Sequence, residues 1–345
     1  MEKIDFVLPW VDGNDPEWLE KKDKYDTNKE KDYNNSNMRF RDWGTLKYVL
    51  RSIEKNCPWY NKIYLITEGH YPDWLDINHE KIVLVTHNEL YFDKSHLPVF
   101  SSSSIEMNLA NIKGLSNKFV YLNDDMIILK KLDTQRFFID NKPVDFLSHG
   151  WLPRNGIFKK LRGMNSWANS LKNNIDLINR IYYPLALNKN SLFHNSYNYK
   201  IKISNFLLHK VYKKFLWLDH WHHPQPYLKS TLLDVHAEYE NEMMICSANR
   251  FRANNDLTQY LYRYWQLASG NFYPYKHNDG KYCKIENRED IDKCLENIEE
   301  YAFFCPNDSV LDGVSEEENY YIEKKLIDKL EEFFPNKAQF EKEDK

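Results

Sequence analysis

FSSSSIEMNLANIKGLSNKFVYLNDDMIILKKL, residues 100–132, is the stretch from which the fold can be inferred. Its serines at 101–104 are candidate N-caps, and the apolar residues that follow recur at helical spacing up to Gly114, a typical helix-ending residue. Residues 119–122 are apolar and partly β-branched, as is typical of an interior strand. The segment therefore predicts a helix followed by a buried strand.

The predicted strand ends in Asn123, Asp124 and Asp125. In open α/β sheets, ligands bind beyond the carboxyl ends of the strands. Carboxylates at that edge suit Mg²⁺ or Mn²⁺ holding a phosphate, because these ions prefer oxygen ligands. Asn and Asp also dominate ordinary turns, so a polar turn without a ligand is the alternative interpretation.

The N-terminal part begins in the same way, with a strand that runs into a polar loop. Residues 4–8 predict the strand, and residues 9–16 form a loop of turn residues that includes Asp12. Many α/β enzymes begin a nucleotide site like this. The chain has no GxGxxG or GxxxxGK[ST] motif, which excludes a dinucleotide fingerprint and a P-loop. Residues 20–38 are charged and Asn-rich, and predict an exposed, mobile segment.

Two arginines accompany the next predicted helix, whose apolar residues lie at i, i+3, i+4 and i+7 over residues 46–53. Arg41 lies near its start and Arg51 on a different face. Arginines near a helix start can clamp a phosphate, although both could equally be surface residues. Strands are predicted at 63–67 and 81–87. The resulting order of strand, helix, strand, strand, helix, strand favours a mainly parallel, three-layer α/β core.

The second half of the chain gives weaker signals. Residues from about 155 to 215 are interpreted as a variable insertion, and a helix is predicted from 206 to 218. The irregular stretch 221–227 holds two adjacent histidines, His222 and His223. These either pack among aromatic residues and prolines, or one of them serves as a base or a phosphate contact.

Two helices are predicted nearer the C-terminus. The first spans 257–268 and is closed by Gly270, with Asp256 or Asn255 as its N-cap. The second is a charged helix within 315–340, which is expected to pack as an accessory element.

Composition limits the class of protein. At 345 residues, 42% hydrophobic and 15% aromatic, the chain can bury a sizeable core. Its net charge of −4 gives no reason to expect a nucleic-acid partner, although the basic run 200–214 could meet a polyanion or a membrane surface. Five cysteines without metal-ligand spacing favour a reducing compartment. No stretch predicts a signal peptide or a membrane span, so a cytoplasmic or peripheral protein is expected.

Several segments together resemble the Stealth family of sugar-phosphate transferases, which includes bacterial capsule phosphotransferases and resembles N-acetylglucosamine-1-phosphotransferase. The first is IDFVLPWVDGNDPEW (4–18). The long second region comprises RFRDWGTLKYVLRSIEKNCPWYNKIYLITEGHYPDWLD (39–76) and THNELYFDKSHLPVFSSSSIEMNLANIKGLSNKFVYLNDDM (86–126). HHPQPYLKS (222–230) and NRFRANNDLTQYLYRYW (249–265) resemble the third and fourth regions.

The resemblance implies a fold and a division of the chain. The fold would be α/β and Rossmann-like (GT-A-like), with a mainly parallel sheet flanked by helices, a helical insertion and a C-terminal helix. Residues 1–312 would form the catalytic domain, with a variable insertion at about 155–215, and residues 313–345 a helical tail.

The resemblance also implies a reaction and its residues. A sugar-1-phosphate would pass from a nucleotide-sugar to a hydroxyl of an oligosaccharide or polysaccharide acceptor, with release of a nucleoside monophosphate. His222 matches rather than His223, because the motif places a proline two residues later. The implied catalytic set is Glu106, Asp125, His222 and Arg252; expected substrate-binding residues are Asp12, Arg41, Arg51, Asn108, Asn123 and Asp256; and expected ligands for Mg²⁺ (or Mn²⁺) are Asp124 and Asp125.

Two other functions remain open at this point. One is a metal-dependent glycosyltransferase, which would release a nucleoside diphosphate. The other is a non-catalytic carbohydrate-binding protein. The expected location is the cytoplasm, with peripheral association with membrane capsule machinery as a further option.

Overall fold

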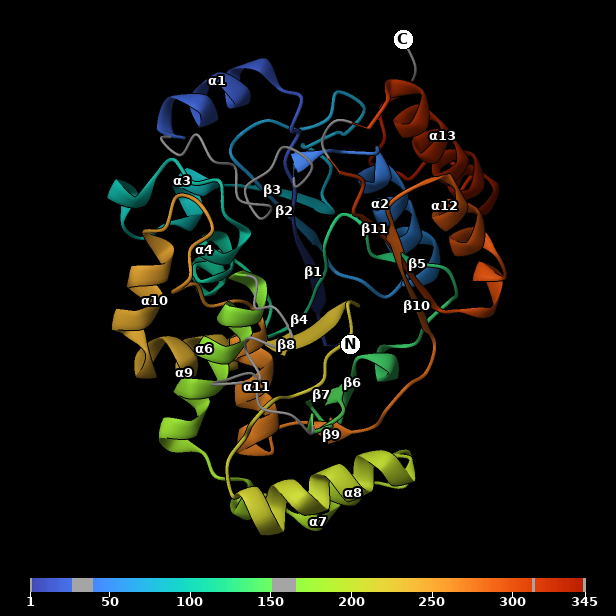
Figure 1. The fold of residues 1–345 in the computed structure, drawn as a ribbon. Coiled ribbons are helices and arrows are strands. Elements are labelled where there is room, and N and C mark those ends of the chain that lie inside the picture. Colours follow the sequence, from blue (N-terminus) through green and yellow to red (C-terminus); the bar gives the residue numbers. More distant parts are fainter. Residues whose placement is uncertain (1, 27–39, 151–165, 312–313, 344–345) are drawn as a thin grey trace.

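The computed structural model describes residues 2–26, 40–150, 166–311 and 314–343 (Figure 1). Much of the segment expected to be mobile, residues 27–38, lies outside the described residues, and so do residues 155–165 of the expected insertion and the domain boundary at Asp312. Residues 20–25 belong to a helix, α1 (Pro16–Tyr25). Among the described residues, no helix combines the length and the apolar character needed to cross a lipid bilayer.

A five-stranded sheet in the order β3-β2-β1-β4-β8 forms the centre of the molecule. β1 (Ile4–Pro9), β2 (Ile63–Thr67), β3 (Ile82–Thr86) and β4 (Lys118–Tyr121) are parallel, which confirms the predicted α/β class. The fifth strand, β8 (Gln225–Leu228), pairs antiparallel with β4 and was not predicted. Its Pro226 has no N–H to donate, and an edge strand tolerates that.

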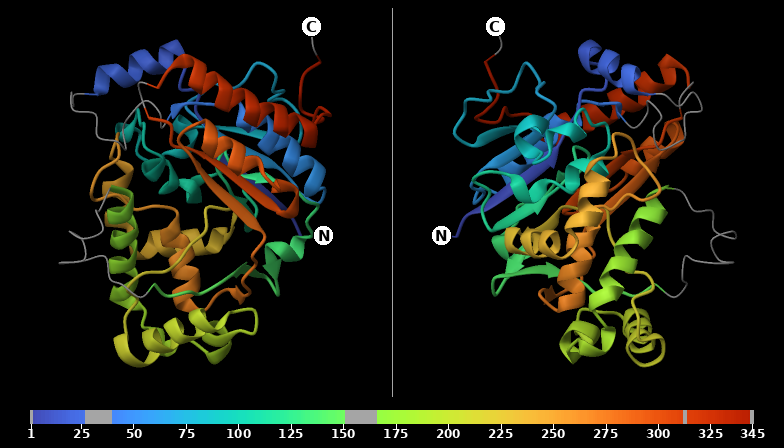
Figure 2. Two further views of the ribbon diagram at one scale, coloured as in Figure 1. Left: turned by 45° about the vertical axis from the view of Figure 1, so that its right-hand side comes forward. Right: turned by 90° about the vertical axis from the view of Figure 1, so that its left-hand side faces the viewer.

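The sheet separates two hydrophobic clusters, because successive side chains of a strand point to opposite faces. Phe6 and Leu8 of β1 face α2 (Thr45–Asn56) and α13 (Glu316–Phe333), whereas Val7 faces the other cluster. That second cluster includes α9 (Lys229–Glu238), α10 (Glu240–Ser247), α11 (Tyr260–Ser269) and α6 (Ser166–Ile181). The views in Figures 1 and 2 show these layers. The predicted three-layer arrangement is confirmed.

The helix predicted between Ser101 and Gly114 is broken. α4 spans only Ser102–Glu106, and a separate 3₁₀ turn covers Leu109–Asn111. Ser101 makes no capping hydrogen bond with its side chain. The carbonyl of Glu106 accepts a hydrogen bond from the Tyr262 hydroxyl at 3.0 Å, so this acceptor is used by a tertiary contact. The continuous helix was therefore a wrong prediction, and Glu106 lies at the end of α4.

A second, smaller sheet lies beside the end of β4. It contains β5 (Ile127–Ile128), β10 (Gly280–Ile285) and β11 (Phe303–Asp308) in the order β10-β11-β5. α12 (Arg288–Leu295) connects β10 to β11. Because β5 follows β4 almost directly and pairs with β11, it brings a distant part of the chain to the strand end that carries the aspartates. β6 (Phe138–Ile139), β7 (Lys142–Asp145) and β9 (Tyr273–Pro274) form a third sheet.

The region expected as an insertion is helical where it is described. After α6 come α7 (Lys189–Phe193) and α8 (Tyr199–Leu207), at one end of the molecule in Figures 1 and 2. α8 continues into a π turn at Leu208–Tyr212, and Lys213 adopts a left-handed backbone with φ of 56°. The helix predicted over 206–218 is therefore misplaced. The short helix α3 (His87–Leu90) follows β3.

The C-terminal segment packs into the core on α2. Ile322, Leu326 and Leu330 of α13 are fully buried, although Tyr320, expected on the apolar side, is exposed. Arg51 of α2 lies here. Its Nε and Nη2 donate to the two carboxylate oxygens of Glu341 at 2.6 and 2.9 Å, and Nη1 donates to the Phe334 carbonyl at 2.6 Å. Arg51 thus fixes the C-terminal segment, and the structure does not place it as a substrate contact.

Candidate active site

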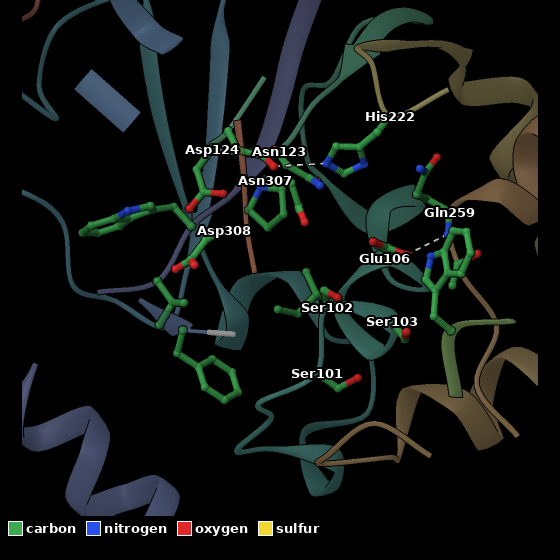
Figure 3. A pocket seen from close by; sticks show the side chains of 18 of the residues that line it. Ser101, Ser102, Ser103, Glu106, Asn123, Asp124, His222, Gln259, Asn307 and Asp308 are labelled. Carbon is green, nitrogen blue, oxygen red and sulfur yellow. Dashed lines mark hydrogen bonds and ion pairs between the residues drawn. The ribbon is translucent and has the colours of Figure 1, made fainter. Parts of the chain in front are cut away.

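One cavity of about 970 Å³ lies at the carboxyl ends of β1 and β4 (Figure 3). Its walls come from the loop after β4, α4, the segment before β8, the segment before α11 and the end of β11. Of the residues predicted from sequence, eight line it: Arg41, Glu106, Asn123, Asp124, Asp125, His222, Arg252 and Asp256.

His222 and Asp125 form the central contact of the cavity. His222 Nε2 lies 3.2 Å from Asp125 Oδ2. The carbonyl of His222 accepts hydrogen bonds from His223 Nδ1 and Cys305 Sγ, both at 2.8 Å, which fixes the backbone that carries the imidazole. Burial lowers the pKa of His222, but the Asp125 carboxylate more than offsets this effect and leaves the pKa raised. The contact holds the imidazole with its Nε2 edge toward Asp125.

Asp124 is surrounded by other carboxylates. Burial, followed by repulsion from Asp125 and Asp42, raises its pKa well above the ordinary value. Asp42 itself receives hydrogen bonds from Trp10 Nε1 at 3.1 Å and from the Gly44 N–H at 2.7 Å. A positive charge bound near Asp124 would relieve this repulsion.

Asn307 and Asp308, at the end of β11, are cavity residues that the sequence analysis missed. Figure 3 shows the carboxyl groups of Asp124 and Asp308 on the same side of the cavity. The apolar run 303–306 followed by Asn-Asp repeats the pattern at the end of β4, and this signal could have identified them.

Arg41 lines the cavity beside Asp308. Its Nη1 lies 3.3 Å from Asp308 Oδ2 and donates to Asn319 Oδ1 at 3.2 Å, while Nη2 donates to the Val310 carbonyl at 3.3 Å. Arg41 therefore anchors the end of β11 to α13 at the cavity wall.

Glu106 lies on another side of the cavity, next to Gln259 in Figure 3. Its Oε2 accepts a 2.7 Å hydrogen bond from the Gln259 N–H, and its Oε1 accepts one from the Tyr121 hydroxyl at 3.2 Å. Burial raises the pKa of Glu106 to about 7, against the lowering effects of these two bonds and of the charge of Arg252. No contact with His222 is present, so Glu106 does not orient the imidazole directly.

Arg252 and Asp256 belong to the segment between α10 and α11. Arg252 Nη2 donates to Ser102 Oγ at 3.2 Å. Asp256 accepts hydrogen bonds from the Ala253 N–H at 2.9 Å and from Asn249 Nδ2 at 2.7 Å, and so closes the loop that carries Arg252. It is not the N-cap of α11, whose cap is Gln259.

Two further predicted substrate residues do not line the cavity. The Asp12 N–H donates to His70 Nε2 at 3.0 Å, and the Asp12 carboxylate accepts from the Asn14 N–H at 2.8 Å, as in an ordinary turn. Asn108 is buried, and its Nδ2 donates to the Ser104 carbonyl at 3.0 Å and to Ser247 Oγ at 2.8 Å. Asn108 therefore supports α4 from behind the cavity.

The oxygen atoms at the end of β4 suit a hard divalent cation. Asp125 Oδ1 is buried and has no hydrogen-bond partner in the described part of the chain. Within the same residues, no group of three or more His, Cys, Asp or Glu side chains forms a metal site. Mg²⁺ usually keeps several waters and binds through one or two carboxylates together with substrate phosphates. The residues present fit an ion of this kind, held jointly with a phosphate.

The chain is similar to known proteins over nearly its whole length. The model of Stealth conserved region 1 matches residues 2–30, and that of conserved region 2 matches residues 39–145. The capsular polysaccharide phosphotransferase WcwK of Streptococcus pneumoniae is 38% identical, with 99% of both chains covered. The receptor polysaccharide phosphotransferase WefC of Streptococcus gordonii is 36% identical, again with 99% of both covered.

One further relative and one solved structure are also similar to this chain. The exopolysaccharide phosphotransferase cps2G of Lactiplantibacillus plantarum is 34% identical over 98% of this chain and 96% of that protein. Among solved structures, the apo-form glycosyltransferase GlyE of Streptococcus pneumoniae aligns over 87% of this chain and 73% of that one, with 12% identity and a TM-score of 0.25, too low to bear on function. The chain therefore belongs to the Stealth family and, like the curated relatives, is an enzyme of the phosphotransferase class.

Proposed function

We propose that this enzyme transfers a hexose-1-phosphate or N-acetylhexosamine-1-phosphate from a nucleotide-sugar to a hydroxyl of a polysaccharide or oligosaccharide acceptor. The acceptor oxygen attacks the phosphorus that carries the sugar, the bond to the second phosphate breaks, and a nucleoside monophosphate leaves. One observation carries the proposal: a single cavity holds the Asp124–Asp125 pair, the His222–Asp125 contact and Arg252. The relatives described above are polysaccharide phosphotransferases, which supports a polysaccharide acceptor.

His222 is proposed as the base that takes the proton of the acceptor hydroxyl. Its Nε2 is occupied by the 3.2 Å contact with Asp125 Oδ2. If Nε2–H donates to the carboxylate, the lone pair resides on Nδ1, which is then the atom that receives the proton. This use of a carboxylate to set the tautomer of a histidine is familiar from hydrolase triads. The contact would also stabilise the imidazolium formed when the proton arrives.

Asp124 and Asp125 are proposed to hold Mg²⁺ or Mn²⁺, with Asn123 and the end of β11 beside them. The bound ion would neutralise charge on the diphosphate of the donor. The buried and unpartnered Oδ1 of Asp125 within the described chain, and the repulsion that raises the pKa of Asp124, support this assignment.

Arg252 is proposed to bind phosphoryl oxygens, because a guanidinium matches the geometry and charge of a phosphate. Asp256 positions the loop of Arg252 through its bonds to Ala253 and Asn249. Glu106 positions the other end of this segment by accepting the Gln259 N–H. Aromatic faces suit a nucleobase and sugar rings, and Trp10, Trp18, Trp43, Trp167 and Trp221 line the same cavity.

The test follows both products of turnover. Purified enzyme, Mg²⁺, oligosaccharide primers and a panel of nucleotide-sugars are incubated, and the nucleotide and the glycan are identified by mass spectrometry. The proposal expects a nucleoside monophosphate together with a glycan that gains sugar plus phosphate. Asp125→Asn should lower the yield of both products by about 10³. Asp133→Asn, at an exposed aspartate of the same chain segment, is the matched control and should leave them unchanged.

Release of a nucleoside diphosphate, with a glycan that gains only the sugar, would instead establish a glycosyltransferase. If the glycan primers bind but no donor in the complete panel is turned over by enzyme that remains folded, the proposed donor class is wrong. Omitting the metal and adding a chelator tests the cofactor separately, since the proposal requires that turnover then stops and returns when Mg²⁺ is restored.

A further inference from the structure

A long stretch of the helical region carries only positive charge. Between residues 177 and 218 the chain has seven basic residues and no Asp or Glu. The whole chain has a net charge of −4, so the remaining residues carry −11. Such segregation within an acidic protein marks a local surface for a negatively charged partner.

The same stretch also exposes large apolar side chains. Seven of the seventeen exposed large hydrophobic residues of the described chain fall within residues 183–212. Three of them, Tyr199, Ile203 and Phe206, lie on α8 at i, i+4 and i+7 and therefore share one face of the helix. Tyr199 is 69% exposed and Phe206 50%.

The opposite face of α8 is fixed to the protein, so the apolar stripe cannot simply turn inward. Ile201 and Leu208 are buried on that side. Asn205 lies between them, and its Nδ2 donates to the carbonyls of Leu147 and Leu192, both at 2.8 Å. The apolar stripe is consequently held toward solvent.

The turn after α8 extends this surface. Val211 and Tyr212 are exposed, and so are Lys210, Lys213 and Lys214. His209 Nδ1 donates to the Pro184 carbonyl at 3.2 Å, which brings the 3₁₀ turn Pro184–Ala186 against it. That turn adds two more exposed side chains, Tyr183 and Leu185. We call this surface the α8 patch; it comprises Tyr183, Leu185, Tyr199, Lys200, Ile203, Phe206, Lys210, Val211, Tyr212, Lys213 and Lys214.

We propose that the α8 patch docks the enzyme on an anionic lipid bilayer. Its apolar side chains would enter the boundary between headgroups and acyl chains, and its lysines would contact the anionic headgroups. Surface helices bind membranes in this way when an apolar face is flanked by basic residues. Each lysine near an anionic surface adds to the electrostatic attraction. Figures 1 and 2 show α7 and α8 at one end of the molecule, and the apolar side chains of the patch are exposed there.

Charge and apolar character together favour a bilayer over other partners. A soluble polyanionic glycan would be bound by the lysines and would leave Ile203, Phe206 and Val211 unused. A second copy of the chain placed patch to patch would bring two sets of lysines together. An anionic bilayer satisfies both kinds of side chain at once. This inference goes beyond the proposed function and does not depend on it, because it concerns binding without turnover.

The test is sedimentation of the full chain with vesicles of phosphatidylcholine alone or mixed with phosphatidylglycerol. The proposal expects binding to the mixed vesicles that weakens as salt is raised. The charge variant Lys210→Glu, Lys213→Glu, Lys214→Glu should lower the partition coefficient at least about tenfold. The apolar variant Ile203→Ser, Phe206→Ser, Val211→Ser should also lower it about tenfold or more.

The matched control replaces three exposed lysines outside the patch with glutamate, at Lys113, Lys131 and Lys142. It therefore changes the net charge by the same amount as the charge variant. Its partition coefficient should stay within about twofold of that of the unmodified chain, because those lysines lie outside the α8 patch. Circular dichroism verifies that each variant is folded, and all the altered side chains are exposed.

Three results would overturn the proposal. One is no binding to the mixed vesicles above that to phosphatidylcholine. Another is equal losses in the patch and control variants. The third is vesicle binding that the apolar substitutions leave unchanged, together with equally strong binding of soluble polyphosphate. That result would assign the patch to a soluble polyanion.

Discussion

The carboxylates at the end of β4 and those at the junction of α2 with the C-terminal segment differ in their hydrogen-bond partners. At the junction, both oxygens of Glu341 accept hydrogen bonds from Arg51, at 2.6 and 2.9 Å. At the end of β4, Asp124 and Asp125 are adjacent, and Asp125 Oδ1 is buried with no partner among the described residues. The first arrangement holds the fold together, whereas the second leaves negative charge available to a ligand.

The pKa shifts have opposite directions in the two regions. Burial raises the pKa of Glu341, but the hydrogen bonds and charge of Arg51 outweigh this effect and leave it lowered. Burial and the charge of Asp125 both raise the pKa of Asp124. Uncompensated charge destabilises a fold, and proteins keep it chiefly where function requires it. Arg51 thus takes both oxygens of Glu341, which indicates a structural role, whereas Asp125 keeps one buried oxygen without a partner among the described residues, which suits a binding site.

The largest effect is expected from removing the structural region altogether. Deleting residues 312–345 would remove Leu326, Leu330 and Phe340, which are all fully buried, and would expose the apolar side chains of α2 that belong to the same cluster. Each buried apolar side chain contributes about 1.5–3 kcal/mol, so the loss approaches the whole stability of a typical domain. Soluble yield and thermal unfolding measure it. A truncated chain that stays folded and active would show that the tail is accessory, as the sequence suggested.

Asp125→Asn should affect the reaction and not the fold. We expect kcat/KM to fall by about 10³, the order of magnitude for removing one preorganised hydrogen-bonding group from an active site. The melting temperature should remain the same or rise, since repulsion with Asp124 disappears. Steady-state kinetics and calorimetry on the same preparation separate the two. A variant that melts well below the parent would place Asp125 among the structural carboxylates.

Arg51→Met should have the reverse outcome. It leaves Glu341 buried without its cation, which typically destabilises a protein by about 3–5 kcal/mol. Enzyme that is still folded at low temperature should keep the kcat of the parent. Denaturant unfolding measures the loss, and Arg51→Met combined with Glu341→Gln should recover part of it. A specific rise in KM for the nucleotide-sugar without loss of stability would restore Arg51 to the substrate site.

Glu106 provides an intermediate case, because its carboxyl is bonded yet has a pKa raised from 4.5 to about 7. Between those values the folded state keeps a proton that the unfolded state has lost. Its contribution to stability is therefore present below pH 4.5 and falls as the pH rises toward 7, by about 1.4 kcal/mol per pH unit. Glu106→Gln should remove this slope from urea unfolding measured between pH 5 and 8. An unchanged slope would show that Glu106 is ionised in the folded enzyme throughout that range.

Local patterns in the sequence were enough for the central layers. The apolar residues of β1, α2, β2, β3 and β4 follow the period of a strand or a helix, and this pattern predicted those elements. Gly270 was predicted to end a helix, and the structure confirms it as the C-cap of α11, with φ of 74°. The Asn-Asp-Asp at the end of β4 followed from the same pattern. Each of these signals lies within about a dozen neighbouring residues, the range over which hydrophobic periodicity operates.

Contacts between distant residues decided the rest. The break after Glu106 involves Tyr262, 156 positions away, and the place of Arg51 depends on Glu341, 290 positions away. The pairing of β11 with β5 brings Asp308 to the cavity. The sequence by itself determined the parallel sheet and the acidic strand end that suits a phosphate-bound cation. The tertiary structure alone decided which charged side chains are paired in the core and which face the cavity, because pairing depends on partners that local sequence does not specify.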